Sequence, residues 1–295
     1  MRVAVVGLGG VGGYICANLS KTQHELVGFA RGAHLETIQK QGLKIVEDEL
    51  SWSVKFDART LEKADGIFEC VLFCVKSYDL EASYAKIASC INEKTVLLSF
   101  ANGVSNGDVL RKISKSIVLD GCVYILSHQE KAGVIRKKGK VFAAVFGGET
   151  EATLCVKELF DAAGLRNKTP LDIKKEIWKK YIFISAFATL TTYYDMSIRR
   201  VYETHPEMCE KLLQEIAGVA AAKGIDIADE VAKAMETASA LPQDASTSMH
   251  LDFQNSKRDE LESLSGYILQ EGQKRGVETP LMQEMYKTLL PRHIF

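Results

Sequence analysis

Three glycines near the start of the chain have the spacing of a dinucleotide-binding loop. Gly7, Gly9 and Gly12 directly follow the apolar run 3–6, and apolar residues at helical spacing follow over 14–19. Between a strand and a helix, such glycines provide a tight turn, room for a pyrophosphate and close helix packing. The alternative is a glycine-rich turn without a ligand, which this placement does not favour. We therefore predict a dinucleotide-binding loop made of Gly7, Leu8, Gly9, Gly10, Val11 and Gly12.

The residue after the second predicted strand indicates which dinucleotide binds. The strand is expected over 24–30, and it ends about 20 residues past the glycines, where a side chain that contacts the ribose is expected. An NAD site usually has Asp or Glu there, whereas this chain has Arg31. A guanidinium holds a 2′-phosphate through charge-assisted hydrogen bonds, and a carboxylate would repel it. We predict NADPH/NADP+ as the cofactor; the alternative is that Arg31 is only a solvated arginine.

Two further strands end in polar residues suited to a cofactor or an anionic substrate. Lys76 follows the run 67–75, and Asn102 and Gly103 follow the run 95–100. Parallel sheets bind ligands beyond the carboxyl ends of their strands, where these side chains are expected to lie. A polar residue that faces water explains Lys76 about equally well when it is taken alone.

Lys180 is the last charged residue before a nearly apolar stretch of a helix expected over 174–194. A ketone that accepts hydride develops negative charge on its oxygen, which needs a proton donor or a fixed positive charge. A lysine against apolar side chains can supply either. Taken alone, however, Lys180 is more simply explained as snorkelling out of a buried helix.

The segment 246–260 adds a hydroxyl and carboxylates that could contact a substrate. Ser248 and Glu260 are the residues of interest there. Taken alone, the serines at 246–248 predict a helix cap, and Asp252 and Glu260 predict a solvated helix face.

Two patterns of elements divide the chain. Up to about residue 166, strand-like runs alternate with helical stretches, as in a parallel α/β sheet. The runs 117–125 and 140–147 predict a hairpin whose basic turn leaves Lys137 solvated. After 166–172 the pattern becomes helical, with helices expected over 174–194, 206–223, 227–239, 246–275 and 280–290. We predict an α/β fold: a Rossmann-type dinucleotide-binding domain over 1–167, then an all-helical substrate and dimerisation domain over 168–295.

Composition excludes several classes of protein. Among 295 residues, Lys and Arg total 37 and Asp and Glu total 38, without the long runs of one sign that nucleic-acid binding needs. Seven cysteines without a CxxC pair fit a reducing cytosol, and no metal site is expected because no ligand cluster has suitable spacing. We expect neither a signal peptide, because the glycines interrupt the first apolar run, nor a membrane-spanning segment, because no charge-free apolar run reaches about 20 residues. We expect a cytoplasmic protein that acts on a small molecule, away from nucleic acid and membranes.

The set of residues resembles the ketopantoate reductases (2-dehydropantoate 2-reductases) over nearly the whole chain. The matching segments are the glycine loop 7–12, Arg31, VKSYD with Lys76, ANGV with Asn102 and Gly103, EIWKKYIFISA with Lys180, STSMHLDF with Ser248 and RDELESLSGYIL with Glu260. The resemblance implies NADPH-dependent reduction of 2-dehydropantoate (ketopantoate) to pantoate, in pantothenate and coenzyme A biosynthesis.

The resemblance also implies roles for single residues. Lys180 is implied to be the general acid, and Glu260 to orient the substrate or the lysine. Asn102 and Ser248 are implied to help hold the substrate or the cofactor. Lys76 is implied to lie near the cofactor in the active site, and Arg31 to bind the 2′-phosphate.

The helix of Lys180 departs from the family pattern. Members often carry asparagines one and two turns beyond the lysine, where this chain has Ile184 and Ala188. The three positions share one helix face, so the loss of two substrate-facing carboxamides is expected to weaken selection for ketopantoate. Nearby hydroxyl groups are the candidates for compensation, namely those of Ser185, Thr189 and Thr192.

Three functions therefore stay open. Reduction of ketopantoate is favoured, and reduction of a different, more apolar 2-oxo acid is the alternative that Ile184 and Ala188 suggest. The third is a nonenzymatic NADP(H)-binding regulator, which would need neither Lys180 nor Glu260. The apolar helices are also compatible with a homodimer.

Overall fold

The computed structural model describes residues 1–293, which divide into two compact units. The first unit comprises Met1–Ala101 and Ser105–Ile173, and the second comprises Asn102–Val104 together with the chain from Lys174 onward. The expected second domain, 168–295, includes residues 294–295, which lie outside the described residues. The turn Asn102–Val104 is thus part of the helical unit, although it follows a strand of the first unit in sequence.

The first unit is built on a sheet that has ten strands within residues 1–293, in the order β4-β3-β9-β8-β7-β6-β1-β2-β5, with β10 beside β9. The strands are β1 (Arg2–Val6), β2 (Glu25–Phe29), β3 (Leu43–Glu47), β4 (Leu50–Val54), β5 (Asp57–Arg59), β6 (Cys70–Phe73), β7 (Val96–Ser99), β8 (Ile117–Lys131), β9 (Val134–Gly147) and β10 (Asn167–Lys168). Strand β1 pairs in parallel with both β2 and β6. The chain therefore leaves β1 where the strand order reverses, which is where doubly wound sheets bind nucleotides.

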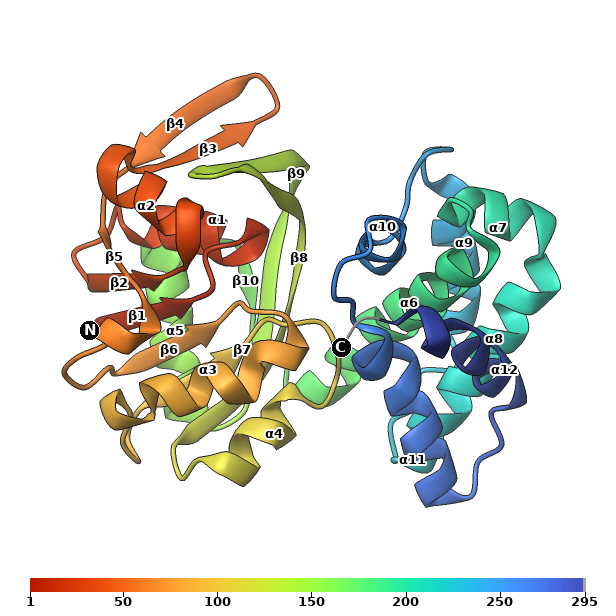
Figure 1. Cartoon of the computed structure of the whole chain (residues 1–295). Coiled ribbons are helices and arrows are strands. Elements are labelled where there is room, and N and C mark those ends of the chain that lie inside the picture. The colour runs from red at the N-terminus through yellow and green to blue at the C-terminus, as the bar shows by residue number, and fades with distance from the viewer. Residues whose placement is uncertain (294–295) are drawn as a thin grey trace. The chain divides into compact units, whose positions relative to one another are not determined.

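Helices cover both faces of this sheet (Figure 1). They are α1 (Gly10–Leu19), α2 (Gly32–Gln41), α3 (Leu80–Ile87), α4 (Asn106–Ile113) and α5 (Thr150–Ala162). Because side chains alternate along a strand, Val3 and Val5 of β1 join the core beneath α1, α2 and α5. Ala4 and Val6 join a second core beneath α3 and α4. The predicted α/β fold is confirmed, and β1 is buried on both faces as its apolar run predicts.

The hairpin of β8 and β9 is longer than the sequence pattern indicates. The two strands pair antiparallel through the stretch predicted as a basic turn, so only residues 132–133 connect them. Lys137 is 4% exposed; its Nζ donates to the carbonyl oxygen of Gly139 at 2.7 Å and lies 3.3 Å from Oε1 of Glu47. The prediction of a solvated Lys137 was wrong, because pairing of β9 with β3 brings the Glu47 carboxylate to it.

The second unit is helical, as predicted (Figure 1). Its helices are α6 (Ile173–Tyr194), α7 (Ile198–Thr204), α8 (Pro206–Ala222), α9 (Glu230–Ala240), α10 (Ser248–Gln254), α11 (Tyr267–Arg275) and α12 (Pro280–Leu289), with a π-helical turn, Glu262–Gly266, before α11. The prediction of one helix over 246–275 was wrong. Ser256 has φ 50°, which lies in the left-handed region and ends helix α10.

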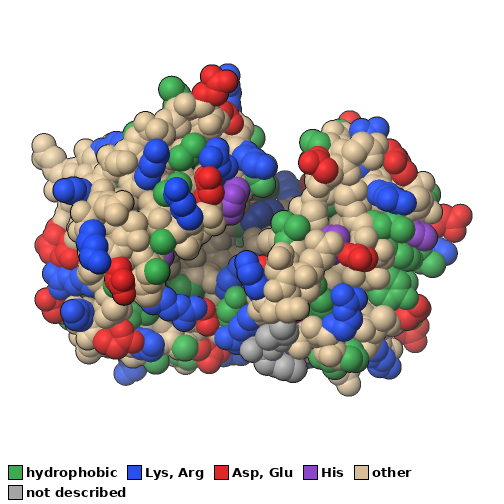
Figure 2. All heavy atoms as spheres, turned by 45° about the horizontal axis from the view of Figure 1, so that its top comes forward, with side chains coloured by type: hydrophobic (Ala, Val, Ile, Leu, Met, Phe, Trp, Pro, Cys, Tyr) green, Lys and Arg blue, Asp and Glu red, His purple; other side chains and the backbone are tan. Residues whose placement is uncertain are grey.

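Charged side chains of both signs are interspersed over the face in Figure 2, in keeping with the formal net charge of -1. Among residues 1–293, every helix is too short or too polar to cross a membrane.

Candidate active site

The glycine loop joins β1 to α1 in a geometry that fits a pyrophosphate. Gly7 has φ 93°, and a Cβ on Gly12 would lie 1.9 Å from the carbonyl oxygen of Gly7, so a side chain fits poorly at either position. A Cβ on Gly9 would have no described heavy atom within 4 Å. The space beside Gly9 is therefore open, and the first turn of α1, residues 10–13, carries no acidic side chain that would oppose an anion.

His34 supports this loop from α2. Its Nδ1 accepts a hydrogen bond from the backbone N–H of Gly133 at 2.9 Å. The proton of the neutral ring therefore sits on Nε2, which donates to the carbonyl oxygen of Leu8 at 2.8 Å. Burial lowers the pKa of His34, although its bond to Leu8 acts in the opposite direction. Sequence reasoning missed this contact, because the three residues are far apart in the chain and form no motif.

Arg31 lies where the ribose-contacting residue is expected, immediately before α2. Its side chain is 90% exposed, and its Nη2 lies 3.5 Å from Oδ2 of Asp79. Asp79 ends a short 3₁₀ turn, Ser77–Asp79, that begins directly after Lys76. A carboxylate therefore lies beside Arg31, which together with Lys76 was predicted to contact the cofactor. Asp79 is part of the sequence VKSYD, but the prediction did not consider it.

Lys180 and Asn102 meet within the second unit. The ammonium of Lys180 donates to Oδ1 of Asn102 at 3.2 Å, across a sequence separation of 78 residues. The turn that presents Asn102 needs Gly103, which is buried and has φ 107°. Two residues predicted separately, one from a strand end and one from an apolar helix, thus form one pair.

The face of α6 beyond Lys180 is apolar. Ile184 is half-buried and Ala188 is 3% exposed. The hydroxyls considered as compensation are buried, and each donates to a backbone carbonyl: Ser185 to Leu264 at 3.0 Å, Thr189 to Ser185 at 2.8 Å and Thr192 to Ala188 at 2.7 Å. These protons are therefore not available to replace the asparagine carboxamides that the resemblance leads us to expect at positions 184 and 188.

Glu260 is buried, at 1% exposure, so its alternative assignment to a solvated helix face was wrong. Its carbonyl oxygen accepts from the backbone N–H of Leu264 at 3.0 Å, which places Glu260 at the entry to the π turn. The neighbouring Asp259 is also buried; its Oδ1 accepts from the backbone N–H of Leu261 at 2.9 Å and lies 2.6 Å from Nδ1 of His293. The segment that carries the Glu260 carboxylate is thus held by backbone hydrogen bonds on its C-terminal side and by the contact of Asp259 with His293.

Ser248 is exposed at the first position of α10. The cap of this helix is Thr247, whose Oγ1 accepts from the backbone N–H of His250 at 3.3 Å and lies 2.8 Å from Oγ1 of Thr191 on α6. Nε2 of His250 lies 2.7 Å from Oδ1 of Asp195, just past α6. The end of α6 therefore fixes the turn that presents Ser248, whose own hydroxyl is not the cap.

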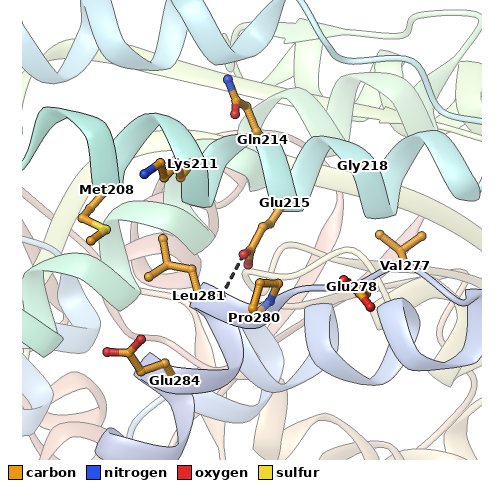
Figure 3. A pocket seen from close by; sticks show the side chains of 10 residues that line it. All are labelled: Met208, Lys211, Gln214, Glu215, Gly218, Val277, Glu278, Pro280, Leu281 and Glu284. Atoms are coloured by element: carbon orange, nitrogen blue, oxygen red, sulfur yellow. Dashed lines mark hydrogen bonds between the residues drawn. The ribbon is translucent and has the colours of Figure 1, made fainter.

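A groove between α8 and α12 lies apart from these residues within the second unit (Figure 3). It has a volume of about 660 Å³, and none of the predicted site residues lines it. The carboxylate of Glu215 accepts from the backbone N–H groups of Leu281 and Met282, at 2.8 and 2.9 Å, at the start of α12. Glu215 thus has a structural role in joining the two helices.

Comparison with known proteins identifies the family. The sequence pattern of ketopantoate reductase PanE/ApbA matches residues 3–148, and that of its C-terminal domain matches residues 172–292. The uncharacterized oxidoreductase YkpB of Bacillus subtilis is 27% identical over 98% of both chains. The 2-dehydropantoate 2-reductase structure from Porphyromonas gingivalis is 30% identical with a TM-score of 0.85, covering 98% of this chain and 99% of that one. The ketopantoate reductase structure from Ralstonia eutropha has a TM-score of 0.92 at 26% identity, covering 99% and 98%.

The chain therefore belongs to the ketopantoate reductase family. It is an oxidoreductase of a family whose members depend on NADH or NADPH. The resemblance predicted from the sequence is confirmed.

Proposed function

We propose that this protein reduces 2-dehydropantoate to pantoate with NADPH, in the cytoplasm, and so supplies pantothenate and coenzyme A biosynthesis. The observation that carries the proposal is the hydrogen bond of 3.2 Å from Lys180 to Asn102, in a chain whose other unit has a glycine loop suited to a dinucleotide. A cation held in place by an amide oxygen can supply the proton or the positive charge that a carbonyl oxygen needs when it accepts negative charge.

Each side chain has a defined part in this proposal. The dinucleotide, when bound, supplies a hydride to the C2 carbon of the 2-oxo acid. Lys180 donates a proton to the carbonyl oxygen as negative charge develops there, while Asn102 fixes the direction of the ammonium. Glu260 orients the lysine or the substrate, and the exposed hydroxyl of Ser248 donates to the substrate carboxylate.

NADPH is the proposed cofactor because Arg31 stands where the 2′-phosphate is contacted. Lys76, Asn102 and Gly103 contribute further contacts to the phosphate-ribose part. Asp79 lowers the advantage of NADPH, since its carboxylate is 3.5 Å from the Arg31 guanidinium and repels a phosphate. We therefore expect a preference for NADPH that is smaller than an unopposed arginine would give.

A second candidate is a reductase of a larger, more apolar 2-oxo acid. Ile184 and Ala188 support it, because both replace substrate-facing carboxamides and the neighbouring hydroxyls donate to backbone carbonyls. A purely regulatory NADP(H)-binding protein has less support, since it would have no need for the contact between Lys180 and Asn102.

Lys180→Ala tests the proposal, with Lys179→Ala as a matched control on the same helix. Lys179 forms an ion pair with Glu176 one turn away and takes no part in the proposed site. We expect Lys180→Ala to abolish 2-oxo acid reduction while NADPH still binds, as followed by fluorescence titration, and Lys179→Ala to retain activity. Undiminished turnover by Lys180→Ala would refute the proposed role.

A further inference from the structure

One face of α6 carries three hydroxyl groups at intervals of four residues. Tyr181, Ser185 and Thr189 lie beside the face of Lys180, Ile184 and Ala188, in a helix that is otherwise largely apolar here. Tyr181 is 1% exposed, and Ser185 and Thr189 are 0% exposed. Buried hydroxyls are costly unless they find hydrogen-bond partners, so the partners of this row indicate its purpose.

All three hydroxyls contact the π turn Glu262–Gly266. The Tyr181 hydroxyl lies 2.7 Å from the carbonyl oxygen of Leu264 and 3.0 Å from that of Ser263. The Ser185 hydroxyl donates to the same Leu264 oxygen at 3.0 Å. Because the proton of Thr189 goes to the carbonyl oxygen of Ser185, the Ser265 hydroxyl donates to Thr189, at an Oγ–Oγ1 distance of 2.7 Å.

The π turn explains why Tyr181 and Ser185 contact backbone carbonyls. A π turn inserts an extra residue into the helical repeat, so its carbonyls depart from the regular α-helical ladder. Buried carbonyls left without donors would destabilise the fold, and apolar side chains on α6 would provide none. Burial raises the pKa of Tyr181 well above the usual tyrosine range, so its hydroxyl keeps its proton and remains a donor at neutral pH.

The same turn is held from its other side by α12. The Tyr286 hydroxyl donates to Oε1 of Glu262 at 2.5 Å. A Cβ on Gly266 would lie 2.8 Å from Oε2 of Glu262, so a larger residue at 266 would displace this carboxylate. The turn is therefore hydrogen-bonded to side chains of both α6 and α12.

The two residues assigned to the chemistry flank these contacts. Tyr181 directly follows Lys180, and the π turn begins two residues after Glu260. We propose that Tyr181, Ser185 and Thr189 are positioning residues, which set the rotation of α6 and thereby hold Lys180 in register with Glu260. The inference rests on the proposed function for the roles of Lys180 and Glu260, whereas the contacts themselves do not depend on it.

Paired variants separate positioning from stability. Tyr181→Phe removes only a hydroxyl, Thr189→Val removes one at nearly constant volume, and Thr189→Ser restores it. Thr192→Val is the matched control. Thr192 is also buried and donates to the carbonyl oxygen four residues earlier, as Thr189 does, but only Thr189 of the two contacts Ser265 in the π turn. We expect Tyr181→Phe and Thr189→Val to lower kcat about tenfold and to change its pH profile, with the dissociation constant for NADPH unchanged, as expected when two groups lose their alignment.

The control and the restoring variant decide the outcome. Thr189→Ser is expected to keep most of kcat, and Thr192→Val to keep kcat even if both melt earlier. Equal kcat losses in Thr192→Val and Thr189→Val, at equal loss of Tm, would overturn the positioning role, as would unchanged kcat in a folded Tyr181→Phe protein.

Hydrogen–deuterium exchange provides a readout that does not depend on the reaction. Tyr181→Phe is expected to speed exchange at 262–268 severalfold, and Lys180→Ala is expected not to. Unchanged exchange in Tyr181→Phe would overturn the inference. If Lys180→Ala instead retained full turnover, the proposed role of Lys180 would fail, while the exchange result would still decide whether the hydroxyl row holds the turn.

Discussion

At the scale of single residues, the partners of a side chain decide what it can do. The role of Lys180 at the edge of an apolar helix is ambiguous in the sequence, because snorkelling is the simpler explanation when the residue is taken alone. The amide oxygen of Asn102 gives its ammonium a fixed direction. Burial of Glu260 likewise distinguishes it from a carboxylate on a solvated helix face.

Asn102 is therefore expected to matter for turnover more than for folding. Removing a hydrogen bond to a charged group costs about 1.5–3 kcal/mol, so Asn102→Ala is expected to lower kcat/KM by about ten- to a hundredfold. Asn102→Asp, which keeps an acceptor, is expected to lose less. Steady-state kinetics measure both variants, and unchanged kcat/KM in Asn102→Ala would contradict this account.

Arg31 and Asp79 are expected to act in opposite directions on the cofactor preference. Arg31→Ala is expected to weaken NADPH binding about tenfold, or about 1.4 kcal/mol, and to affect NADH little. Asp79→Asn is expected to tighten NADPH binding severalfold by removing the opposing charge. Titration of both cofactors checks this; equal effects on NADPH and NADH would rule out contact with the 2′-phosphate.

His34 is expected to make stability depend on pH. Burial lowers its folded-state pKa, so the folded state favours the neutral ring and the unfolded state binds more protons. Stability is therefore full above the usual histidine pKa of about 6.5 and falls as the pH drops through that value towards the lowered one. Denaturant unfolding at pH values from about 7.5 to 5.5 is expected to show a smaller decline in His34→Gln than in wild type; identical slopes would contradict this.

At the scale of elements, substitutions at two glycines of the loop are expected to distinguish an effect on folding from an effect on dinucleotide binding. A Cβ on Gly12 would lie 1.9 Å from the oxygen of Gly7, whereas one on Gly9 would have no described heavy atom within 4 Å. Gly12→Ala is therefore expected to lower Tm markedly. Gly9→Ala is expected to retain Tm and lose dinucleotide binding, because its methyl group would occupy the space proposed for the pyrophosphate. Thermal melts and titrations test the pair; tight binding by Gly9→Ala would contradict the proposed location.

Sequence patterns predicted an element correctly where neighbouring residues alone determine its structure. The apolar run of β1, the glycine turn and the stretch of α6 without Gly or Pro are such local features, and the structure has each at the expected place. The prediction of one helix over 246–275 was wrong because Ser256 adopts a left-handed backbone conformation, which a serine does not indicate in the sequence. Lys137 was misjudged because its partner Glu47 comes from another strand. The row of hydroxyls on α6 was visible as spacing, but its purpose needed the π turn.

At the scale of the whole molecule, the chain combines two compact units for which we propose different tasks. The sheet unit offers the open glycine loop, and the helical unit contains Lys180, Asn102, Ser248 and Glu260. Membership of the ketopantoate reductase family agrees with this division of elements. A homodimer stays a prediction, which sedimentation of the purified protein would test.

Cofactor oxidation by the purified protein is the most direct test of the central claim. NADPH consumption would be followed with ketopantoate and, in parallel, with larger and more apolar 2-oxo acids. The proposed function predicts efficient turnover of ketopantoate, with the other acids slower. Turnover of only the apolar acids would replace the proposed substrate, and no turnover of any 2-oxo acid despite tight NADPH binding would contradict the assignment as a 2-oxo acid reductase.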